Sequence, residues 1–295
     1  MIRNILISMR PYQWAKNVLV FAALFFSLSF LNIQAIQLSV GAFIAFCLVS
    51  SGVYLMNDIR DKKADRLHPV KKNRPIASGN LPVSTALFVL FLLMGLGLVL
   101  SFIINQGLFI ILIFYVLMNL AYSLGLKKVV LVDVMIIAMG FLLRAVAGAF
   151  AIGVAVSPWL FICTLMLALL LVFGKRRHEL AMLQAEAGKH RKSLEQYSLP
   201  FLDGLMFISA GAAIVTYSLY TMAEEVVSRF GTQWLLATTP LAIYGVFRYL
   251  YLVYIKKDGG DPTKLMITDK PFLINALLWV LSVISILFFS KYSPV

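Results

Sequence analysis

Three aspartates stand at the end of a long apolar run, in the stretch NDIRDKKAD that begins at Asn57. They are Asp58, Asp61 and Asp65, and spacings of three and four residues place all three on one face of a helix. Carboxylates crowded on one face repel each other unless a cation lies between them. Mg²⁺ prefers hard oxygen ligands and is usually held by one or two carboxylates together with substrate phosphates. We therefore expect Asp58, Asp61 and Asp65 to bind Mg²⁺.

Basic side chains crowd the same segment and the residues after it. They are Arg60, Lys62, Lys63, Arg66, Lys71, Lys72 and Arg74. Arg74 can grip phosphate oxygens through a bidentate fork, and Lys72 can add a point charge. His68 is expected to be structural, because transfer from a good phosphate leaving group does not require a base. A solvated mixed-charge loop is the alternative, but carboxylates beside cations favour a site for a Mg²⁺-bound diphosphate.

The N-terminal stretch RPYQWAKN gathers Arg10, Gln13, Trp14, Lys16 and Asn17. Aromatic and basic residues in this arrangement are typical of an anchor at the membrane surface. Gln13 and Asn17 are one α-helical turn apart, so an α-helix would turn both side chains toward the same neighbours. Lys16 is a candidate ligand for an anionic substrate group.

A third group consists of Tyr122, Lys127, Lys128, Asp133 and Arg144. Asp133 and Arg144 are eleven residues apart, about three helical turns, and share one face of an apolar helix. A charge within a membrane span is costly and usually faces a polar cavity or a partner. These residues are expected to bind substrate, and a buried structural ion pair is the alternative.

A fourth group follows the sixth apolar segment, in GKRRHEL and RKSLEQY. It contains Lys175, Arg176, Arg177, Glu179, Arg191 and Lys192. A belt of cations at the end of a span holds anionic membrane lipid by default. The position of this belt relative to the acidic stretch supports a phosphate-binding site as well as it supports lipid binding. The candidate ligands are Lys175, Arg177, Glu179 and Arg191.

The elements that position these groups are membrane helices. The 295-residue chain is 61% hydrophobic and only 13% charged, which excludes an ordinary soluble domain. Its cysteines, Cys47 and Cys163, lie in apolar runs and form no disulfide or zinc pattern. The sequence predicts an all-α polytopic membrane protein in a single domain, 1–295, because backbone in lipid must satisfy its own hydrogen bonds. Nine apolar segments of sufficient length are expected at 17–33, 38–57, 84–104, 107–125, 130–152, 158–174, 205–224, 233–255 and 271–290.

The basic residues alternate along these nine segments. Every second loop, beginning with the N-terminal stretch, carries lysine and arginine, whereas the loops between carry almost none. Because basic loops stay in the cytoplasm, we expect the N-terminus and two cap loops, at about 58–83 and 175–204, to be cytoplasmic. The C-terminus is expected to be external, and the protein is expected to lie in the plasma membrane.

At this point the residues resemble a known family. NDIRDKKAD followed by NRPIASG resembles the first Asp-rich motif of the UbiA superfamily of intramembrane prenyltransferases, and the resemblance covers nearly the whole chain. Within this superfamily, the chain is most similar to the decaprenyl-phosphate phosphoribosyltransferases. The stretches that carry this similarity are RPYQWAKNVLVFAALFF, YSLGLKK, GFLLRAVAGAFAIG, GKRRHEL and RKSLEQY. Two departures agree with that subgroup: no second pair of aspartates follows the sixth segment, and the family's YxxxK motif reads Tyr122 to Lys127, one residue longer.

The resemblance implies a UbiA-like helical bundle and a Mg²⁺-dependent transferase. 5-Phosphoribosyl 1-diphosphate would donate its phosphoribosyl group to a polyprenyl phosphate, with Asp58 and Asp61 as the catalytic residues that hold the metal on the leaving diphosphate. Asn57 and Asp65 would support them, while Lys16, Arg66, Arg74, Lys127, Arg144, Lys175 and Arg177 gather the anionic substrates. An aromatic prenyltransferase is the second reading, and a lipid-binding protein or transporter is the third. No nucleic-acid partner is expected, and a homo-oligomer is left open.

Overall fold

The computed structural model describes residues 1–185 and 194–292, and every regular element in them is a helix. The chain separates into two compact units. Unit 1 contains residues 1–126 and 143–155, and unit 2 contains residues 127–142 and 156–295. The boundary falls inside α8 (Val132–Ala151), so that one helix contributes residues to both units. The expectation of one domain over 1–295 stays a prediction.

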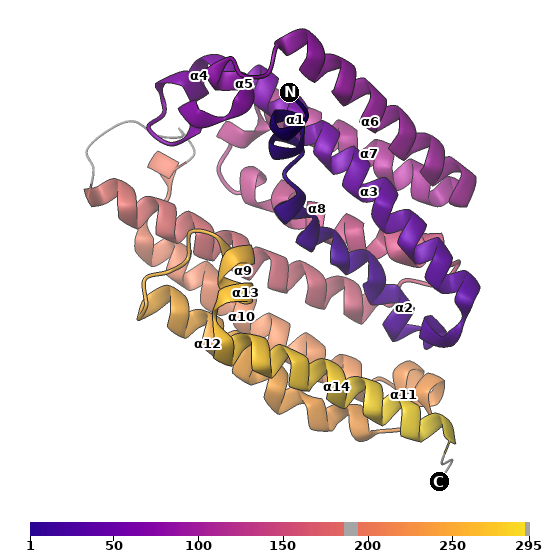
Figure 1. Cartoon of the computed structure of the whole chain (residues 1–295). Helices are drawn as coiled ribbons and strands as arrows, with labels where there is room; N and C mark the ends of the chain where they lie inside the picture. The colour runs from indigo at the N-terminus through magenta and orange to yellow at the C-terminus, as the bar shows by residue number, and fades with distance from the viewer. Residues whose placement is uncertain (186–193, 293–295) are drawn as a thin grey trace. The chain divides into compact units, whose positions relative to one another are not determined.

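Unit 1 is built on α3, which packs along α6 and also contacts α7. The long helices are α3 (Ile33–Arg60), α6 (Val83–Ile104) and α7 (Gln106–Leu124), and α1 (Ile2–Met9) packs on α3 (Figure 1). Asparagine side chains cap α3 and α7: Asn32 accepts from two backbone N–H groups, and so does Asn105. The short elements α4 (Lys62–Leu67), η3 (Lys71–Asn73) and α5 (Pro75–Ser78) form the predicted first cap loop.

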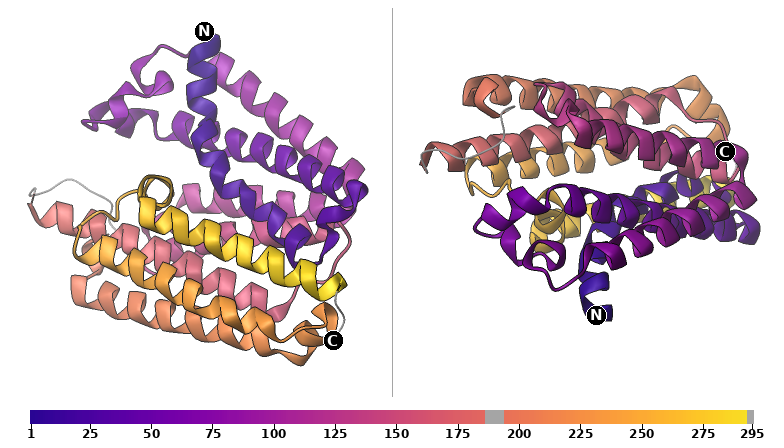
Figure 2. Two further views of the ribbon diagram at one scale, coloured as in Figure 1. Left: turned by 60° about the horizontal axis from the view of Figure 1, so that its bottom comes forward. Right: turned by 90° about the horizontal axis from the view of Figure 1, so that it is seen from above.

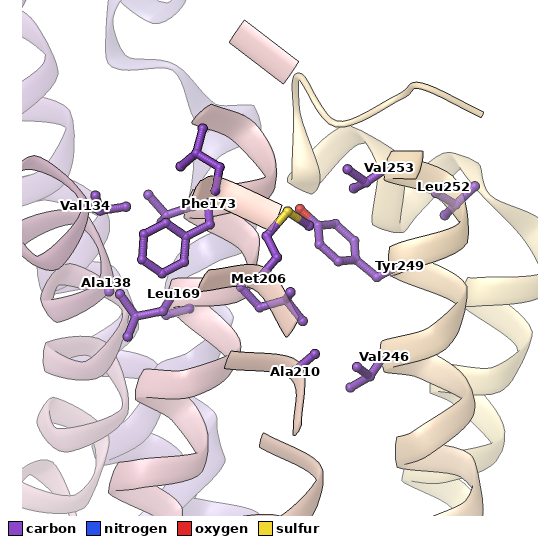
Figure 3. Packing of buried hydrophobic residues seen from close by; sticks show 14 of the residues in the cluster. Val134, Ala138, Leu169, Phe173, Met206, Ala210, Val246, Tyr249, Leu252 and Val253 are labelled. Carbon is purple, nitrogen blue, oxygen red and sulfur yellow. The ribbon is translucent and has the colours of Figure 1, made fainter. Parts of the chain in front are cut away.

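Unit 2 is a layer of antiparallel helices in which α9 packs on α10, α10 on α12, and α12 on α14 (Figure 2). Their bounds are α9 (Pro158–Ala185), α10 (Leu199–Met222), α12 (Thr239–Tyr254) and α14 (Lys270–Tyr292), joined by α11 (Glu224–Phe230), η6 (Trp234–Thr238) and α13 (Pro262–Thr268). Figure 3 shows the core, where Phe173 of α9, Met206 of α10 and Tyr249 of α12 come together. Gly174 permits this contact, because a Cβ there would lie 2.3 Å from the Tyr249 hydroxyl oxygen.

Eight stretches among the described residues are helical, long and apolar enough to cross a membrane, so this is an integral membrane protein. They correspond to the second through ninth predicted segments. The first predicted segment, 17–33, differs because it is broken. Residues Pro11–Phe21 form a 3₁₀-helix, η1, followed by the short α2 (Ala22–Phe26) and η2 (Ser29–Leu31), and Leu28 between them has a φ of 58°.

The 3₁₀ geometry of η1 changes which of its side chains share a face. A 3₁₀-helix has three residues per turn, so positions i and i+3 align. Trp14 and Asn17 both contact α3: Trp14 Nε1 donates to Ser51 Oγ at 3.0 Å, and Asn17 Nδ2 donates to Ser50 Oγ at 3.3 Å. Gln13 aligns with Lys16 and not with Asn17, which corrects the expectation that Gln13 and Asn17 face the same way.

A glycine allows η1 to lie against the end of α8 within unit 1. A Cβ added to Gly148 would lie 1.8 Å from the carbonyl oxygen of Val20, so only glycine permits this approach. The side chain of Val20 is itself fully buried. This contact fixes η1 beside the segment of α8 that carries Arg144.

Candidate functional site

The acidic stretch forms a cluster with two arginines in unit 1. Asp58, only 2% exposed at the end of α3, accepts hydrogen bonds on Oδ1 from Arg10 Nη2 at 2.5 Å and from Arg74 Nη1 at 3.1 Å. The same Arg74 nitrogen donates to Asp65 Oδ2 at 2.7 Å. One cationic nitrogen therefore bridges two buried carboxylates. The guanidinium of Arg10 also lies over the ring of Tyr54, 5.1 Å from its centroid.

The helical backbone of the acidic stretch continues across a break between two helices. α3 ends at Arg60, and Asp61 stands between α3 and α4. The backbone N–H of Asp61 still donates to the Asn57 carbonyl, and that of Asp65 donates to the Asp61 carbonyl, so the helical phase continues across the junction. Asn57 Oδ1 accepts a hydrogen bond from Ser123 Oγ of α7.

Other residues of the first cap loop have structural partners. Arg66 Nε donates to the backbone carbonyl of Ala77 at 2.9 Å, which ties α4 to α5. His68 Nδ1 accepts from the backbone N–H groups of Val70 and Lys71, in agreement with its predicted structural role. The loop then ends at Gly79, whose φ of 89° favours glycine.

A second polar cluster of unit 1 surrounds Arg144, which is 5% exposed inside α8. Its Nε donates to Asn17 Oδ1 at 2.7 Å, and its Nη2 donates to the hydroxyl of Tyr115 at 3.1 Å. The guanidinium also lies 5.1 Å from the ring centroids of both Phe46 and Tyr115. A charge within a membrane-spanning helix is thus held by polar oxygens and aromatic faces.

Unit 2 holds a different polar cluster around Asp133, which is fully buried. Asp133 Oδ2 accepts from Arg176 Nε at 3.0 Å, and its Oδ1 accepts from the Tyr197 hydroxyl at 3.0 Å. Arg176 also donates to Glu179 Oε2 at 2.5 Å. Asp133 and Arg144 therefore have different partners, each within its own unit, although they share a face of α8.

Tyr197 connects the start of α8 to the segment before α10. Its hydroxyl oxygen accepts from the backbone N–H of Leu131, a residue with a φ of 64°, while its O–H donates to Asp133. Burial, together with its position beside a carboxylate, raises the pKa of Tyr197 to about 12. The phenol is thus kept neutral and serves as both donor and acceptor.

The other basic residues of unit 2 that were predicted to bind substrate differ in their contacts. Arg177 Nε donates to Asp203 Oδ1 at 2.5 Å, and its guanidinium lies 4.3 Å from the ring centroid of Tyr254. Lys175 is half exposed, and its Nζ lies 3.9 Å from Glu179 Oε1. Lys127 is half-buried in η4 (Leu126–Lys128). Arg191 lies outside the described residues.

Lys16 in η1 and Tyr122 in α7 are half-buried residues of unit 1. The side-chain oxygen Oε1 of Gln13 is buried and has no hydrogen-bond partner among the described residues, so it is available as an acceptor. The sequence did not single out Tyr54, Tyr115 or Asp203 as partners of these charges. A tyrosine in an apolar helix carries no spacing signal, because its packing alone explains it. The roles of the predicted site residues stay predictions.

Comparison with known proteins identifies a matching family and similar sequences. The UbiA prenyltransferase family matches residues 18–268. A decaprenyl-phosphate phosphoribosyltransferase of Mycolicibacterium smegmatis is 32% identical over 98% of this chain and 94% of its own length. One from Corynebacterium glutamicum is 34% identical over 94% of this chain and 84% of its own length.

The fold has a solved counterpart. A UbiA homologue from Archaeoglobus fulgidus, solved bound to GPP and Mg²⁺, superposes with a TM-score of 0.72 over 96% of this chain and 99% of that chain, at 18% identity. The helical architecture and the sequence relatives agree on one assignment. This chain belongs to the UbiA prenyltransferase family.

Proposed function

We propose that this protein transfers a 5-phosphoribosyl group from 5-phosphoribosyl 1-diphosphate to a polyprenyl phosphate and releases diphosphate. The bond between C1 of the ribose and the diphosphate oxygen breaks, and the diphosphate leaves with the electron pair. An oxygen of the lipid phosphate forms the new bond to C1. That oxygen is already anionic, so the reaction does not require a general base.

The observation that carries this proposal is the similarity to proteins named decaprenyl-phosphate phosphoribosyltransferase, at 32–34% identity over 94–98% of the chain. The distribution of charge supports it. The reaction brings together a diphosphate, a sugar phosphate and a lipid phosphate, and these anions repel each other. One acidic cluster and several separate cations suit that set of substrates.

Two carboxylates of the acidic cluster face one cation, whereas no group of three acidic, histidine or cysteine side chains among the described residues is gathered closely enough to hold a metal. A single nitrogen of Arg74 reaches both Asp58 and Asp65, so a cation placed between these carboxylates can contact both. Asp58, Asp61 and Asp65 would hold Mg²⁺, and the solved UbiA homologue was bound to this ion. When bound, Mg²⁺ would neutralise charge that develops on the leaving diphosphate. Asp58 and Asp61 are the proposed catalytic residues.

The cations would bind and orient the substrates. In unit 1, Arg74 would contact the diphosphate, and Arg144 would contact a phosphate of the donor sugar or of the lipid. Arg66 donates to Ala77 through Nε, so the other two nitrogens of its guanidinium can still act as donors. The other proposed substrate-binding residues are Lys16, Asn57, Tyr122, Lys127, Asp133, Lys175, Arg177, Glu179 and Arg191.

We also propose that the N-terminus and the loops around 58–83 and 175–204 are cytoplasmic, where a soluble sugar diphosphate is accessible. The alternation of basic loops supports this orientation. Reporter fusions after Asn80 should read as cytoplasmic, and fusions after Tyr292 as external. A cytoplasmic signal from the C-terminal fusion would overturn the orientation.

The decisive experiment for the reaction uses the purified chain in detergent with Mg²⁺, labelled 5-phosphoribosyl 1-diphosphate and a polyprenyl phosphate. Label should enter the lipid extract only when polyprenyl phosphate is present, and an Asp58→Asn sample serves as the matched blank. An aromatic prenyltransferase is the second candidate, because the solved fold relative was bound to GPP. Coupling of a prenyl diphosphate to an aromatic acid, with no use of the sugar diphosphate, would establish that candidate instead.

A further inference from the structure

Gln13 carries a buried side-chain oxygen without a hydrogen-bond partner in the described part of the chain. This atom is Oε1 of an amide near the start of η1. Nearly all buried side-chain oxygens in folded proteins accept at least one hydrogen bond, because an unpaired buried acceptor loses its contacts with water and gains nothing in return. Such an atom near a binding site is an acceptor for a donor group of a substrate.

The 3₁₀ geometry of η1 gives Gln13 a face separate from the contact with α3. With three residues per turn, positions 12, 15 and 18 form one face, and all three are exposed. A second face carries Trp14 and Asn17, which donate to serines of α3. Gln13 lies on the third face with Lys16, and both residues are half-buried. The buried oxygen of Gln13 is therefore not used to pack η1 against α3.

The start of η1 is fixed beside the acidic cluster of unit 1. The backbone N–H of Gln13 donates to the carbonyl of Arg10 at 2.9 Å, and the guanidinium of Arg10 contacts Asp58. The next residue, Trp14, donates to Ser51, which lies two helical turns before Asp58 and so on the same face of α3. Gln13 is thus one turn of η1 away from the arginine that contacts a carboxylate of the proposed diphosphate site.

The chemistry of the candidate substrates limits what this oxygen can accept from. At about pH 8, phosphate and diphosphate groups are ionised and carry acceptors only. Polyprenyl phosphate and prenyl diphosphates therefore offer no donor. 5-Phosphoribosyl 1-diphosphate offers two, the hydroxyls on C2 and C3 of its ribose. A hydroxyl group also accepts from an amide N–H, so it can pair with either end of the glutamine amide.

We propose that Gln13 binds a ribose hydroxyl of the sugar diphosphate donor, on C2 or C3, and thereby selects this donor over prenyl diphosphates. The inference rests on the proposed function, because it takes 5-phosphoribosyl 1-diphosphate as the donor. A site built to bind a substrate hydroxyl discriminates against the analogue without it, since the polar group of the site is then left unpaired. Gln13 is a specificity-determining residue for the donor and has no role in binding the lipid acceptor.

The test removes each partner of the proposed hydrogen bond separately. The full-length wild type and Gln13→Met, purified in detergent with Mg²⁺, are titrated at equilibrium with 5-phosphoribosyl 1-diphosphate and with its 2-deoxy and 3-deoxy analogues. Methionine has nearly the size of glutamine but is only a weak acceptor. The wild type should bind one analogue about tenfold more weakly than the parent compound. Gln13→Met should bind the parent about tenfold more weakly than the wild type does, and should bind that analogue and the parent equally.

Two controls separate hydroxyl recognition from a general disturbance of the protein. Gln37 is exposed in α3, so Gln37→Met makes the same exchange and should leave all dissociation constants unchanged. Polyprenyl phosphate should bind Gln13→Met as tightly as it binds the wild type. Weaker binding of this lipid by Gln13→Met would overturn the inference. Equal binding of the parent and both analogues by the wild type would also overturn it, as would a wild-type preference for the parent that persists in Gln13→Met.

Gln13→Glu decides the question if Gln13→Met does not fold. Glutamate keeps an oxygen acceptor but adds a negative charge that repels the phosphates, so affinity should fall for the parent and the analogue alike. The preference for the parent should stay at about tenfold. Loss of that preference in Gln13→Glu would contradict the inference. Wild-type protein that shows the preference but transfers no label to polyprenyl phosphate would refute the proposed function alone, and wild-type protein that does not bind 5-phosphoribosyl 1-diphosphate would refute both.

Discussion

Two buried arginines, one in each unit, are held by different chemistry. Arg176 of unit 2 is 2% exposed and donates to the carboxylates of Asp133 and Glu179. Arg144 of unit 1 is 5% exposed and donates to the amide of Asn17 and the phenol of Tyr115. The burial is similar, but the partners just named differ in charge.

This difference predicts different effects of substitution around the two arginines. A carboxylate neutralises a buried guanidinium, and removing either partner leaves an uncompensated buried charge. Asn17 and Tyr115 orient the guanidinium of Arg144 through neutral oxygens. We therefore expect changes around Arg176 to reduce stability, and changes around Arg144 to reduce substrate binding and turnover.

The largest effect is expected for Asp133→Asn. This variant replaces the fully buried carboxylate beside Arg176 by a neutral amide, which should reduce the free energy of unfolding by about 3–5 kcal/mol. Chemical or thermal unfolding in detergent measures the loss. The double variant Asp133→Asn with Arg176→Met should recover much of it. A single variant as stable as the wild type would mean that the Asp133 pair does not hold this region.

Asp58→Asn should leave the protein folded but reduce Mg²⁺-dependent turnover about a hundredfold, roughly 3 kcal/mol in the activation barrier. Its partners Arg10 and Arg74 are partly exposed, so water can solvate them when the carboxylate is lost. Glu225→Gln removes an exposed carboxylate of α11 and is the control. Near-normal turnover of a folded Asp58→Asn would exclude the catalytic role.

Arg144→Gln should lower turnover about thirtyfold, roughly 2 kcal/mol, with a smaller loss of stability than Asp133→Asn. The reason is that glutamine can still donate to Asn17 while the charge is gone. Parallel measurement of turnover and unfolding in both variants tests the contrast directly. A strongly destabilised but fully active Arg144→Gln would reverse the comparison between the two arginines.

Lys175→Ala should weaken use of the sugar diphosphate about tenfold, roughly 1.4 kcal/mol, without a change in melting temperature. Lys175 is half exposed and lies 3.9 Å from Glu179, so its charge is not committed to a short ion pair. Arg177 is held by Asp203 and Tyr254, and Arg177→Ala should lower stability as well. Lys256→Ala at an exposed position is the control. Identical stability for the Lys175 and Arg177 variants would contradict this distinction.

The smallest effect concerns Tyr197, which tightens the Asp133 cluster. Its pKa is raised to about 12, so folding favours the neutral phenol. The stability gained from the neutral form is fully present below about pH 10 and is lost as the pH rises through about 12. Tyr197→Phe should cost about 1 kcal/mol at neutral pH and show a weaker loss of stability between pH 10 and 12. If the wild type and Tyr197→Phe lost the same free energy of unfolding between pH 10 and 12, the role assigned to the Tyr197 hydroxyl would be contradicted.

Most of the fold was predictable because membrane spans follow from length and hydropathy. Residues 84–104 and 107–125 correspond closely to α6 and α7, since lipid requires an unbroken apolar helix there. The first segment was less predictable, because apolar composition does not distinguish an α-helix from a 3₁₀-helix. That choice depends on the contacts of Trp14, Asn17 and Val20 and on the close approach of Gly148 to Val20.

The candidate site was predictable where the residues are neighbours in sequence. The spacing of Asp58 and Asp65 predicted a common face, and one nitrogen of Arg74 contacts both. The partners of Arg144 were not predictable in the same way. Asn17 and Tyr115 lie 127 and 29 residues away from it, and no local pattern relates them.

The sequence by itself determined the class of this protein: an integral membrane protein of helices, with acidic and basic side chains of the UbiA family at recognisable spacings. Hydropathy and helical periodicity are local properties of the sequence, so they do not depend on the tertiary fold. The tertiary structure decided which oxygens meet each buried guanidinium, giving Arg176 a carboxylate and Arg144 an amide. That decision depends on packing between distant helices, because only packing brings a particular oxygen to a particular guanidinium.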